Sequence, residues 1–366
     1  MKQIFLNHKG HVVLDEAAMP AVGKGQALVR VLSSAISGGT ESRSLSTTQS
    51  NASWQKKASR FVATLRNHGV KKTYEKLNSR RNSRISLGYS CVGEVVDIAE
   101  DISDVKKGDI VACMGAEYAF HAEYVAVPRS LFVAVPSSVA VEEASLITLG
   151  CVALHAMRNA RVQLGETVMV VGMGVIGQIV SQLLTLSGVC VIAVDMKEDR
   201  IVLAKELGAK AGIHCTARAD FAEVDEMTNH HGVDAVIFCA GGTKFDILEK
   251  TACVCRDRAR FVIVGCIDLH LPWTIFYQKE LEMVVSRSTG PGRRDPLFES
   301  HNHAYPRGYI RWTEQENAQE IMHLLAAGKL HFKPLIARTF PFRDAEAAYH
   351  QLLRGDSLTI ILDYTK

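Results

Sequence analysis

Apolar residues follow two different patterns along the chain, and the pattern changes near residue 155. Before residue 135, short apolar runs alternate with polar residues, and turn-forming residues separate the runs. Strands spaced in this way are typical of an all-β, barrel-like domain. We therefore predict a β-rich first domain whose strands include residues 27–32, 90–96, 110–113 and 124–127.

From about residue 155, apolar runs with the length of buried strands alternate with helical segments. An example is the helical stretch 199–207, which ends at Gly208. Such alternation predicts a parallel sheet with right-handed crossovers, the doubly wound α/β (Rossmann) architecture. Its predicted strands are residues 167–171, 190–194, 233–239, 260–264 and 282–285.

Beyond the last of these strands the pattern changes again. Thr313 and Glu316 form a capping box, which predicts a helix that closes at Gly328. A last helix over 344–353 and a strand over 357–364 follow. We expect this final strand to return to the first domain.

The stretch 167–195 holds the most informative motif of the chain. An apolar strand leads into Gly172, Gly174 and Gly177, spaced as G-x-G-x-x-G, and a helix, a second strand and Asp195 follow. In such a motif the first glycine allows a tight turn, the second lets the backbone approach a pyrophosphate, and the third lets the helix pack on the strand. The helix N-terminus then offers free N–H groups and a positive dipole end to the phosphates.

Asp195 favours NAD(H) over NADP(H). Its carboxylate can accept hydrogen bonds from the adenosine ribose hydroxyls and would repel a 2′-phosphate. The alternative is a doubly wound sheet that binds no dinucleotide, since this fold also serves other functions. The predicted cofactor contacts of the motif are Gly172, Met173, Gly174, Val175, Ile176, Gly177, Asp195, Met196 and Lys197.

The composition is that of a globular protein with two domains: 366 residues, of which 47% are hydrophobic and 22% charged. No run of about 18 apolar residues appears, and the N-terminus lacks the apolar stretch of a signal peptide. Nine cysteines without a disulfide framework suit a reducing compartment. We expect a cytoplasmic protein with no membrane partner.

Residues 54–85 carry ten Lys or Arg and one Glu, a net charge of +9 in a chain whose net charge is +3. Apolar residues at helical spacing predict two short basic amphipathic helices, inserted into the first domain. Two interpretations stay open: a solvated face packed on the barrel, or an electrostatic funnel for an anionic substrate such as a nucleotide sugar or a phosphate. Nucleic acid is disfavoured because no aromatic stacking platform accompanies the charge.

Several phrases give the chain a resemblance to the medium-chain dehydrogenase/reductase family over nearly its whole length. They are SGGTES at 37–42, LGYSCVGEVVDI at 87–98, KKGDIVA at 106–112, HAEYVAVP at 121–128, LGCVALHA at 149–156 and LGETVMVVGMGVIG at 164–177. The stretch 290–317 resembles a branch found as one half of two-domain oxidoreductases in sugar and polysaccharide pathways. Similar enzymes include glycoside dehydrogenases that oxidise a ring hydroxyl.

The resemblance implies a GroES-like β-barrel catalytic domain over 1–152, an NAD-binding Rossmann domain over 153–287 and a return to the catalytic domain over 288–366. It also implies a homodimer or homotetramer, since sheet edges pair between subunits in this family. Further cofactor contacts are expected at the ends of the later sheet strands, at Cys239, Ala240, Gly241, Val264, Gly265 and Arg287.

The likeness fails at the metal-ligand positions of the zinc-dependent members. Those positions hold Gly38, Tyr89 and Cys151 in this chain. One thiolate cannot hold a tetrahedral zinc, and the four clustered cysteines of a structural-zinc lobe are absent from the sequence. We therefore expect no metal, and the alternative is an unusual site among His121, Cys151 and His155.

Without zinc, side chains must exchange the hydroxyl proton and stabilise the developing alkoxide during hydride transfer. The resemblance assigns Thr40 to the proton relay and Glu41 to structuring the site. It places Tyr89 at the reacting carbon and His155 on the nicotinamide side. Arg43 and Arg287 are candidate cations that would lower the pKa of the Tyr89 phenol. Purely structural roles stay open for all of them, as a turn cap, a core aromatic, a core histidine or a surface ion pair.

Residues 293–312 add six Arg or His side chains among Tyr305, Tyr309 and Trp312, which suits a glycosyl or phosphate pocket or, alternatively, a basic surface loop. These features together predict a zinc-independent oxidoreductase that transfers hydride between NAD(H) and a secondary hydroxyl or ketone of an anionic sugar or nucleotide sugar. Two alternatives stay open: an NAD(P)H-dependent reductase of an activated C=C bond or quinone, and a non-catalytic NAD(H)-binding subunit.

Overall fold

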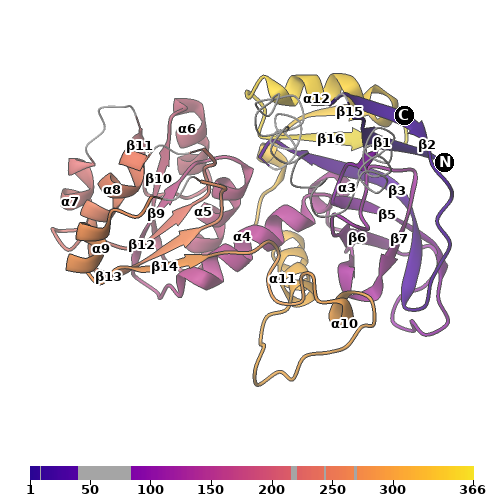
Figure 1. Ribbon diagram of the computed structural model, residues 1–366, viewed down its shortest axis with the longest axis horizontal. Coiled ribbons are helices and arrows are strands. Elements are labelled where there is room, and N and C mark those ends of the chain that lie inside the picture. The colour runs from indigo at the N-terminus through magenta and orange to yellow at the C-terminus, as the bar shows by residue number, and fades with distance from the viewer. Residues whose placement is uncertain (9, 40–83, 216–220, 243–244, 268–269) are drawn as a thin grey trace, which may run out of the picture.

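A computed structural model describes residues 1–8, 10–39, 84–215, 221–242, 245–267 and 270–366. These residues form a parallel-sheet half and a β-rich half that lie side by side (Figure 1). Both ends of the chain lie in the β-rich half. The predicted basic helices over 54–85 fall outside the described residues except for the last two positions, and so do Thr40 and Glu41.

Six parallel strands in the order β11-β10-β9-β12-β13-β14 form the first sheet. The chain moves outward from β9 to β11 and then crosses to β12 on the other side of β9, so the strand order reverses between β9 and β12. Ligands of doubly wound sheets bind at this switch point, beyond the carboxyl ends of the strands. The strands are β9 (Thr167–Val171), β10 (Cys190–Asp195), β11 (Ala211–His214), β12 (Val233–Phe238), β13 (Cys255–Ile263) and β14 (Glu282–Val285).

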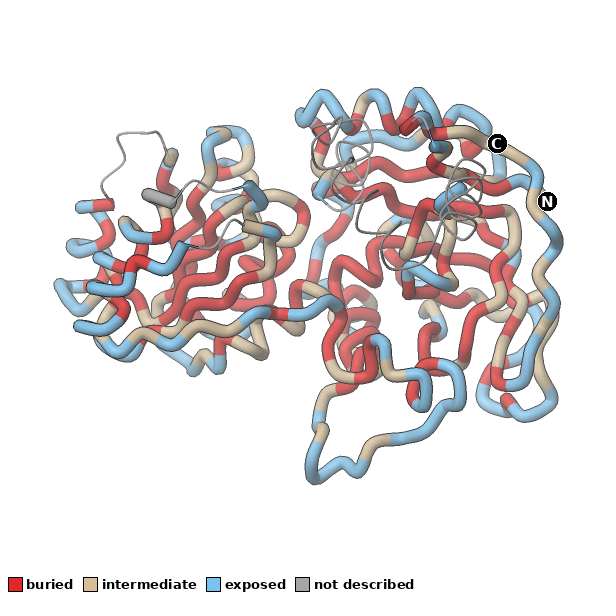
Figure 2. Tube along the Cα trace, in the orientation of Figure 1, coloured by how far each residue is buried: buried red, intermediate tan, exposed pale blue. Residues whose placement is uncertain are grey.

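Helices cover both faces of this sheet, and its central strands are correspondingly apolar and buried (Figure 2). In β9 only the first residue is partly exposed. The helices of this half are α5 (Val175–Leu186), α6 (Glu198–Glu206), α7 (Ala222–Met227), α8 (Phe245–Cys253) and α9 (Trp273–Gln278).

The β-rich half holds a seven-stranded sheet in the order β15-β16-β3-β5-β6-β8, with β7 paired to β3, and a three-stranded sheet in the order β2-β1-β4. The last strand, β16, pairs antiparallel with β3, so the C-terminal segment returns to the first part of the chain as predicted. The strands are β1 (Lys2–Leu6), β2 (Val12–Glu16), β3 (Gln26–Ser37), β4 (Ile85–Ser86), β5 (Ser90–Ile98), β6 (Ile110–Met114), β7 (Tyr124–Pro128), β8 (Phe132–Ala134), β15 (Ile336–Pro341) and β16 (Thr359–Asp363).

Two helices, α4 (Ile147–Ala160) and α11 (Glu314–Ala326), pack where the halves meet. One buried apolar cluster includes Leu154 on α4, Ile179 on α5 and Ile321 on α11, so the halves share a core. The remaining helices are α3 (Val141–Ala144), α10 (Pro296–Glu299) and α12 (Ala345–Leu353), with short 3-10 turns η1 (Arg129–Leu131), η2 (Lys333–Leu335) and η3 (Phe342–Asp344).

The predicted fold class, a doubly wound parallel sheet beside a β-rich half, is confirmed. Strands β9 and β14 have the predicted bounds, whereas β13 begins at Cys255 instead of Arg260. The capping box is also present: the Thr313 hydroxyl accepts a hydrogen bond from the Glu316 N–H at 3.2 Å, and the Glu316 carboxylate accepts one from the Thr313 N–H at 2.9 Å.

Candidate active site

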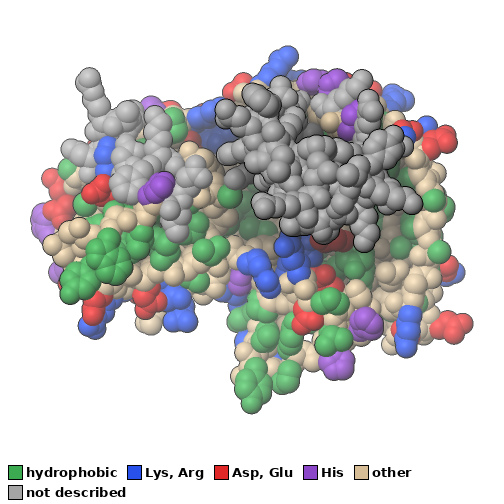
Figure 3. Space-filling view, in the orientation of Figure 1, with side chains coloured by type: hydrophobic (Ala, Val, Ile, Leu, Met, Phe, Trp, Pro, Cys, Tyr) green, Lys and Arg blue, Asp and Glu red, His purple; other side chains and the backbone are tan. Residues whose placement is uncertain are grey.

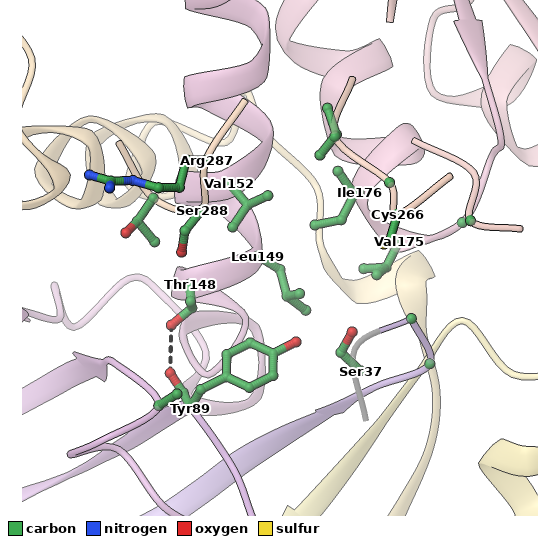
Figure 4. A pocket seen from close by; sticks show the side chains of 18 of the residues that line it. Ser37, Tyr89, Thr148, Leu149, Val152, Val175, Ile176, Cys266, Arg287 and Ser288 are labelled. Carbon is green, nitrogen blue, oxygen red and sulfur yellow. Dashed lines mark hydrogen bonds between the residues drawn. The ribbon is translucent and has the colours of Figure 1, made fainter. Parts of the chain in front are cut away.

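A cleft of about 1390 Å³ lies between the two halves (Figure 4). The loop after β9 and the segments after β12 and β13 form its first wall. The residues between β4 and β5, together with α4, form the opposite wall. The segment after β14 and the start of α11 close a third side, so the segments after β9, β12, β13 and β14 face one space, whereas the end of β10 does not line it.

The loop after β9 has no room for side chains at two of its three glycines. Gly172 has a φ of 92°, and a Cβ there would lie 2.6 Å from the Ala240 nitrogen. A Cβ on Gly177 would lie 2.0 Å from the Gly172 carbonyl oxygen. A Cβ on Gly174 would meet nothing within 4 Å, because this residue faces the open cleft as the N-cap of α5.

The ends of β12 and β13 complete the first wall. Cys239, Gly241, Val264 and Gly265 all line the cleft. A Cβ on Gly265 would lie 1.9 Å from the Ala240 carbonyl oxygen, so the backbones of the two strand ends touch. The wall therefore consists mostly of backbone and small side chains, so a flat ligand could approach it closely.

The Asp195 carboxylate, 9% exposed, is held against the glycine loop. One of its oxygens accepts a hydrogen bond from the Met173 N–H at 2.6 Å, and the other accepts one from the Lys197 N–H at 2.9 Å. The Arg200 guanidinium lies 4.0 Å away. The strand end, the acid and the loop thus form one rigid unit, although Asp195 itself is not among the residues that line the cleft.

Tyr89 extends from the opposite wall. Its backbone is fixed because the Thr148 hydroxyl donates a hydrogen bond to the Tyr89 carbonyl at 2.9 Å. The next residue, Ser90, donates to the Ser145 carbonyl at 2.7 Å. Figure 4 shows the Tyr89 ring running across the cleft towards the space between Leu149 and Ser37.

The three positions that the resemblance assigns to zinc ligands hold a glycine, a tyrosine and a cysteine. Gly38 supplies no ligand, and the buried Cys151 thiol contacts the Met114 sulfur at 3.5 Å. Burial raises the pKa of that thiol well above its usual value. Across the described ranges, no group of three or more His, Cys, Asp or Glu side chains is arranged to hold a metal ion.

A buried acidic and basic cluster lies on the third side of the cleft. Arg293 is 8% exposed in its side chain and bridges Glu299 and Glu117, each at 2.6 Å. Beside it, Glu314 is 1% exposed and accepts a hydrogen bond from the Thr289 hydroxyl at 2.5 Å. Burial raises the pKa of the Glu314 carboxyl to about 7, against the opposing effect of that hydrogen bond.

Two exposed arginines, Arg287 and Arg294, line the cleft near this cluster, and basic side chains gather where the halves meet (Figure 3). Arg287 donates a hydrogen bond to the Arg293 carbonyl at 3.0 Å, and neither Arg287 nor Arg294 forms an ion pair with a described residue. Unpaired guanidinium groups at a cleft are suited to bind an anion.

His155 lies behind the cleft wall. Its Nε2 is 3.2 Å from the Asn159 side-chain nitrogen, which also donates to the hydroxyl of the cleft-lining Ser286 at 3.1 Å. Burial, with the nearby Arg158 and Arg287 charges, lowers the pKa of His155, so the ring is neutral at physiological pH. It reaches the cleft through two neighbours and is not itself part of the lining.

Known proteins resemble this chain over most of its length. A family model described as zinc-binding dehydrogenase matches residues 175–299. The D-arabitol-phosphate dehydrogenase of Enterococcus avium is 23% identical over 315 residues, which are 76% of this chain and 81% of that protein. An NAD-dependent alcohol dehydrogenase of Saccharolobus solfataricus is 26% identical over 300 residues, which are 73% of this chain and 78% of that protein.

Solved structures share the fold. The galactitol-1-phosphate dehydrogenase of Escherichia coli superposes with a TM-score of 0.75 at 21% sequence identity, covering 99% of this chain and all of that one. These comparisons support the resemblance to the medium-chain dehydrogenase/reductase family. The family resemblance drawn from the sequence is thereby confirmed.

The predicted site residues are only partly brought together. The cleft is lined by Tyr89, Gly174, Val175, Ile176, Gly177, Cys239, Gly241, Val264, Gly265 and Arg287. Residues that do not line it are Gly172, Met173, Asp195, Met196, Lys197, Ala240 and His155. Met196 is exposed, and the Lys197 ammonium contacts the Gly355 carbonyl at 2.9 Å.

Sequence reasoning missed Glu314 and Thr289. Glu314 is the first residue of α11, where an acidic residue is ordinary because it favours the helix dipole. Its burial arises from packing against the segment after β14, which has no repeating pattern in the sequence.

Substituting glycines of the loop by alanine is expected to separate structural from ligand-facing positions. Gly177→Ala should lower the free energy of unfolding by more than about 2 kcal/mol, because overpacking costs about 1–3 kcal/mol or more. Gly174→Ala should cost less than about 1 kcal/mol, since only a helix cap changes. Urea denaturation followed by circular dichroism measures both, and equal stabilities of the two variants would contradict the loop packing.

Proposed function

We propose that this chain is an NAD(H)-dependent, zinc-independent oxidoreductase that transfers hydride to or from a secondary hydroxyl or ketone of an anionic, sugar-like substrate. The observation that carries the proposal is the cleft itself. The glycine loop and helix N-terminus lie on one wall and Tyr89 on the other, and Gly38 and Tyr89 stand at positions that the resemblance assigns to zinc ligands.

NAD(H) fits the first wall. When bound, the nicotinamide ring supplies the hydride acceptor or donor. The open Gly174 and the start of α5 would hold the pyrophosphate, and the strand ends with Cys239, Gly241, Val264 and Gly265 would face the rest of the dinucleotide. The Asp195 carboxylate would accept hydrogen bonds from the adenosine ribose hydroxyls. Hydrogen bonds from the Met173 and Lys197 N–H groups already fix its orientation. Met196, Ala240 and Arg287 complete the predicted set.

Zinc independence is compatible with the match to the family model, although that model is described as zinc-binding dehydrogenase. That model matches residues 175–299, whereas the zinc-ligand positions fall at residues 38, 89 and 151, outside the matched segment. The proton chemistry would therefore belong to side chains. Tyr89 would contact the reacting oxygen, and Thr40, Glu41 and His155 keep the supporting roles that the resemblance gives them.

An anionic substrate is supported by charge. Arg287 and Arg294 lie at the cleft, next to the Ser288 hydroxyl, and neither forms an ion pair with an acid in the described part of the chain. Guanidinium forks match phosphate and carboxylate oxygens. Two similar proteins act, by name, on phosphorylated polyols: the D-arabitol-phosphate and galactitol-1-phosphate dehydrogenases.

We also propose a homodimer or homotetramer in the cytoplasm. Strand β14 is an edge of the parallel sheet, and its last residue, Val285, is 68% exposed. The neighbouring Trp273 and Tyr277 are 67% and 71% exposed and stack on each other. An apolar sheet edge of this kind is suited to pair with a second copy. No helix among the described residues is long and apolar enough to cross a membrane.

The proposed activity is tested by screening polyols, sugar phosphates and nucleotide sugars with NAD⁺, following NADH absorbance. Once a substrate is found, Tyr89→Phe should lower kcat about 100-fold or more, the usual range for losing an acid–base group. Binding of NADH without oxidation of any candidate would favour the non-catalytic subunit. Full turnover by Tyr89→Phe would favour reduction of a C=C bond or quinone, which needs only hydride delivery.

Metal analysis is the control for this assay. The purified protein should contain no stoichiometric zinc and keep its activity after dialysis against a chelator. One tightly bound zinc per chain would contradict zinc independence.

Cofactor choice is expected to depend on Asp195. The wild type should use NAD⁺ at least about 100-fold more efficiently than NADP⁺, from charge repulsion against the 2′-phosphate. Asp195→Asn should cut this preference at least tenfold, because Arg200, 4.0 Å away, would then pair with that phosphate. Steady-state kcat/KM for both cofactors measures this, with the exposed first-turn acid substitution Asp199→Asn as the matched control. An unchanged ratio would show that Asp195 does not select the cofactor.

The anion contact is expected to show in substrate affinity. Arg294→Ala should raise KM roughly tenfold for a phosphorylated polyol that the enzyme uses, since a charge-assisted hydrogen bond is worth about 1.5–3 kcal/mol. KM for the unphosphorylated counterpart should stay within about twofold. Arg343→Ala, an exposed arginine outside the cleft, is the control. Equal effects on both substrates would argue against an anion site.

A further inference from the structure

Glu314 is a buried carboxyl group whose two oxygens have different environments. One oxygen accepts the hydrogen bond from the Thr289 hydroxyl at 2.5 Å. The other oxygen is buried and has no hydrogen-bond partner within the described structure. A buried oxygen without a partner costs about 1–3 kcal/mol, so this arrangement does not exist for stability.

The helix start does not require this acid. The Thr313 hydroxyl caps α11 and Glu316 completes the capping box, so both helix-capping roles are already filled. Glu314 follows the cap, and its side chain turns instead to Thr289 on the segment after β14. Both Glu314 and Thr289 line the cleft, on the side where Arg287 also lies.

The charges around Glu314 hold it between its two protonation states. Burial disfavours the carboxylate, and so do two neighbouring acids, Glu299 and Glu117. The Arg293 charge and the Thr289 hydrogen bond favour the carboxylate but do not outweigh burial. The other titratable groups that face Glu314 are Cys151 on α4 and Tyr305. A carboxyl group balanced in this way can take up and release a proton near neutral pH.

We propose that Thr289 and Glu314 form the proton relay of the reaction, in place of the Thr40 hydroxyl to which the resemblance assigns that role. In the oxidation direction the substrate O–H donates its proton to the Thr289 oxygen, and the Thr289 hydroxyl passes its own proton to the Glu314 carboxylate. The substrate C–H bond breaks as hydride leaves for the nicotinamide, and the C=O double bond forms. In reduction every transfer is reversed, with the Glu314 acid as the proton source. Tyr89 then donates a hydrogen bond to the same substrate oxygen and need not ionise.

This inference rests on the proposed dehydrogenase function and makes Glu314 the proton acceptor, acting through Thr289. The relay requires the carboxylate for oxidation, so kcat for oxidation should rise with pH and level off above about pH 7. Reduction should show the opposite dependence, because it requires the acid.

Glu314→Gln tests the relay. It should lower kcat for oxidation about 100-fold or more and remove the pH dependence between pH 6 and 8.5, while KM and NADH binding stay within about twofold. Thr289→Val should reproduce the loss, and Thr289→Ser, which keeps the hydroxyl, should restore most of the activity. Glu320→Gln on the same helix, outside the cleft, is the matched control and should leave kcat and its pH profile unchanged.

The pH dependence of the free energy of unfolding gives a readout that does not depend on turnover. Because the folded state raises the pKa of Glu314, its contribution to stability is fully present below pH 4.5 and is lost as the pH rises through about 7. Glu314→Gln should therefore gain stability relative to wild type between pH 5 and pH 8.5 in urea denaturation.

The outcomes separate the two proposals. If the wild type is active and Glu314→Gln has the same kcat and pH profile, the relay is wrong but the proposed function is unaffected. Full activity in Thr289→Val would overturn the route through Thr289. A wild type that binds NADH and oxidises no hydroxyl compound would overturn the proposed function and the relay together.

Discussion

Contact between backbone segments at the carboxyl ends of three strands sets the position of everything else in the cleft. The Gly177 Cα faces the Gly172 carbonyl, Gly172 faces the Ala240 nitrogen, and Gly265 faces the Ala240 carbonyl, each too close for a Cβ. These contacts lock β9, β12 and β13 together at the point where the sheet topology reverses. At these positions the first wall of the cleft therefore accepts only glycine. Substitutions are accommodated more easily on the walls that face it.

The walls of the cleft differ in the kind of chemistry they offer. The parallel-sheet wall presents backbone and small side chains, which bind without supplying a proton. The facing sides carry Tyr89, Thr289, Glu314 and the arginines, each held by the β-rich half or by the segment after β14. A protein built in this way can keep its ligand-binding wall and change its reactive side chains independently, because the two lie on different elements.

The sequence was sufficient to predict the features that depend on local periodicity. The strands, the glycine loop, Asp195 at the end of β10 and the Thr313–Glu316 capping box all follow from apolar spacing or short-range hydrogen bonding. From the sequence, Asp195 was predicted to bind the cofactor ribose. The structure adds a contact that the spacing does not reveal, a hydrogen bond from the Met173 N–H to the Asp195 carboxylate.

Glu314 could not be recognised in the same way. Its unusual protonation depends on burial by Thr289 and on Arg293, Glu299 and Glu117, which come from separate segments. Position along a helix says only that an acid near the N-terminus is favourable. His155 is likewise a residue type that is common in active sites, but it does not line the cleft. Its ring contacts Asn159, which in turn contacts the cleft-lining Ser286.

The pairing of β16 with β3 has a consequence for how the molecule is made. The Ser34 hydroxyl lies 3.0 Å from that of Tyr364, 330 positions later in the chain. During synthesis β3 therefore cannot pair with β16 until residues 359–363 have left the ribosome, after the whole parallel sheet has emerged. Until then this part of β3 has an unpaired edge, which is a site where another strand could pair wrongly. The parallel-sheet half can therefore begin to fold before the β-rich half is complete.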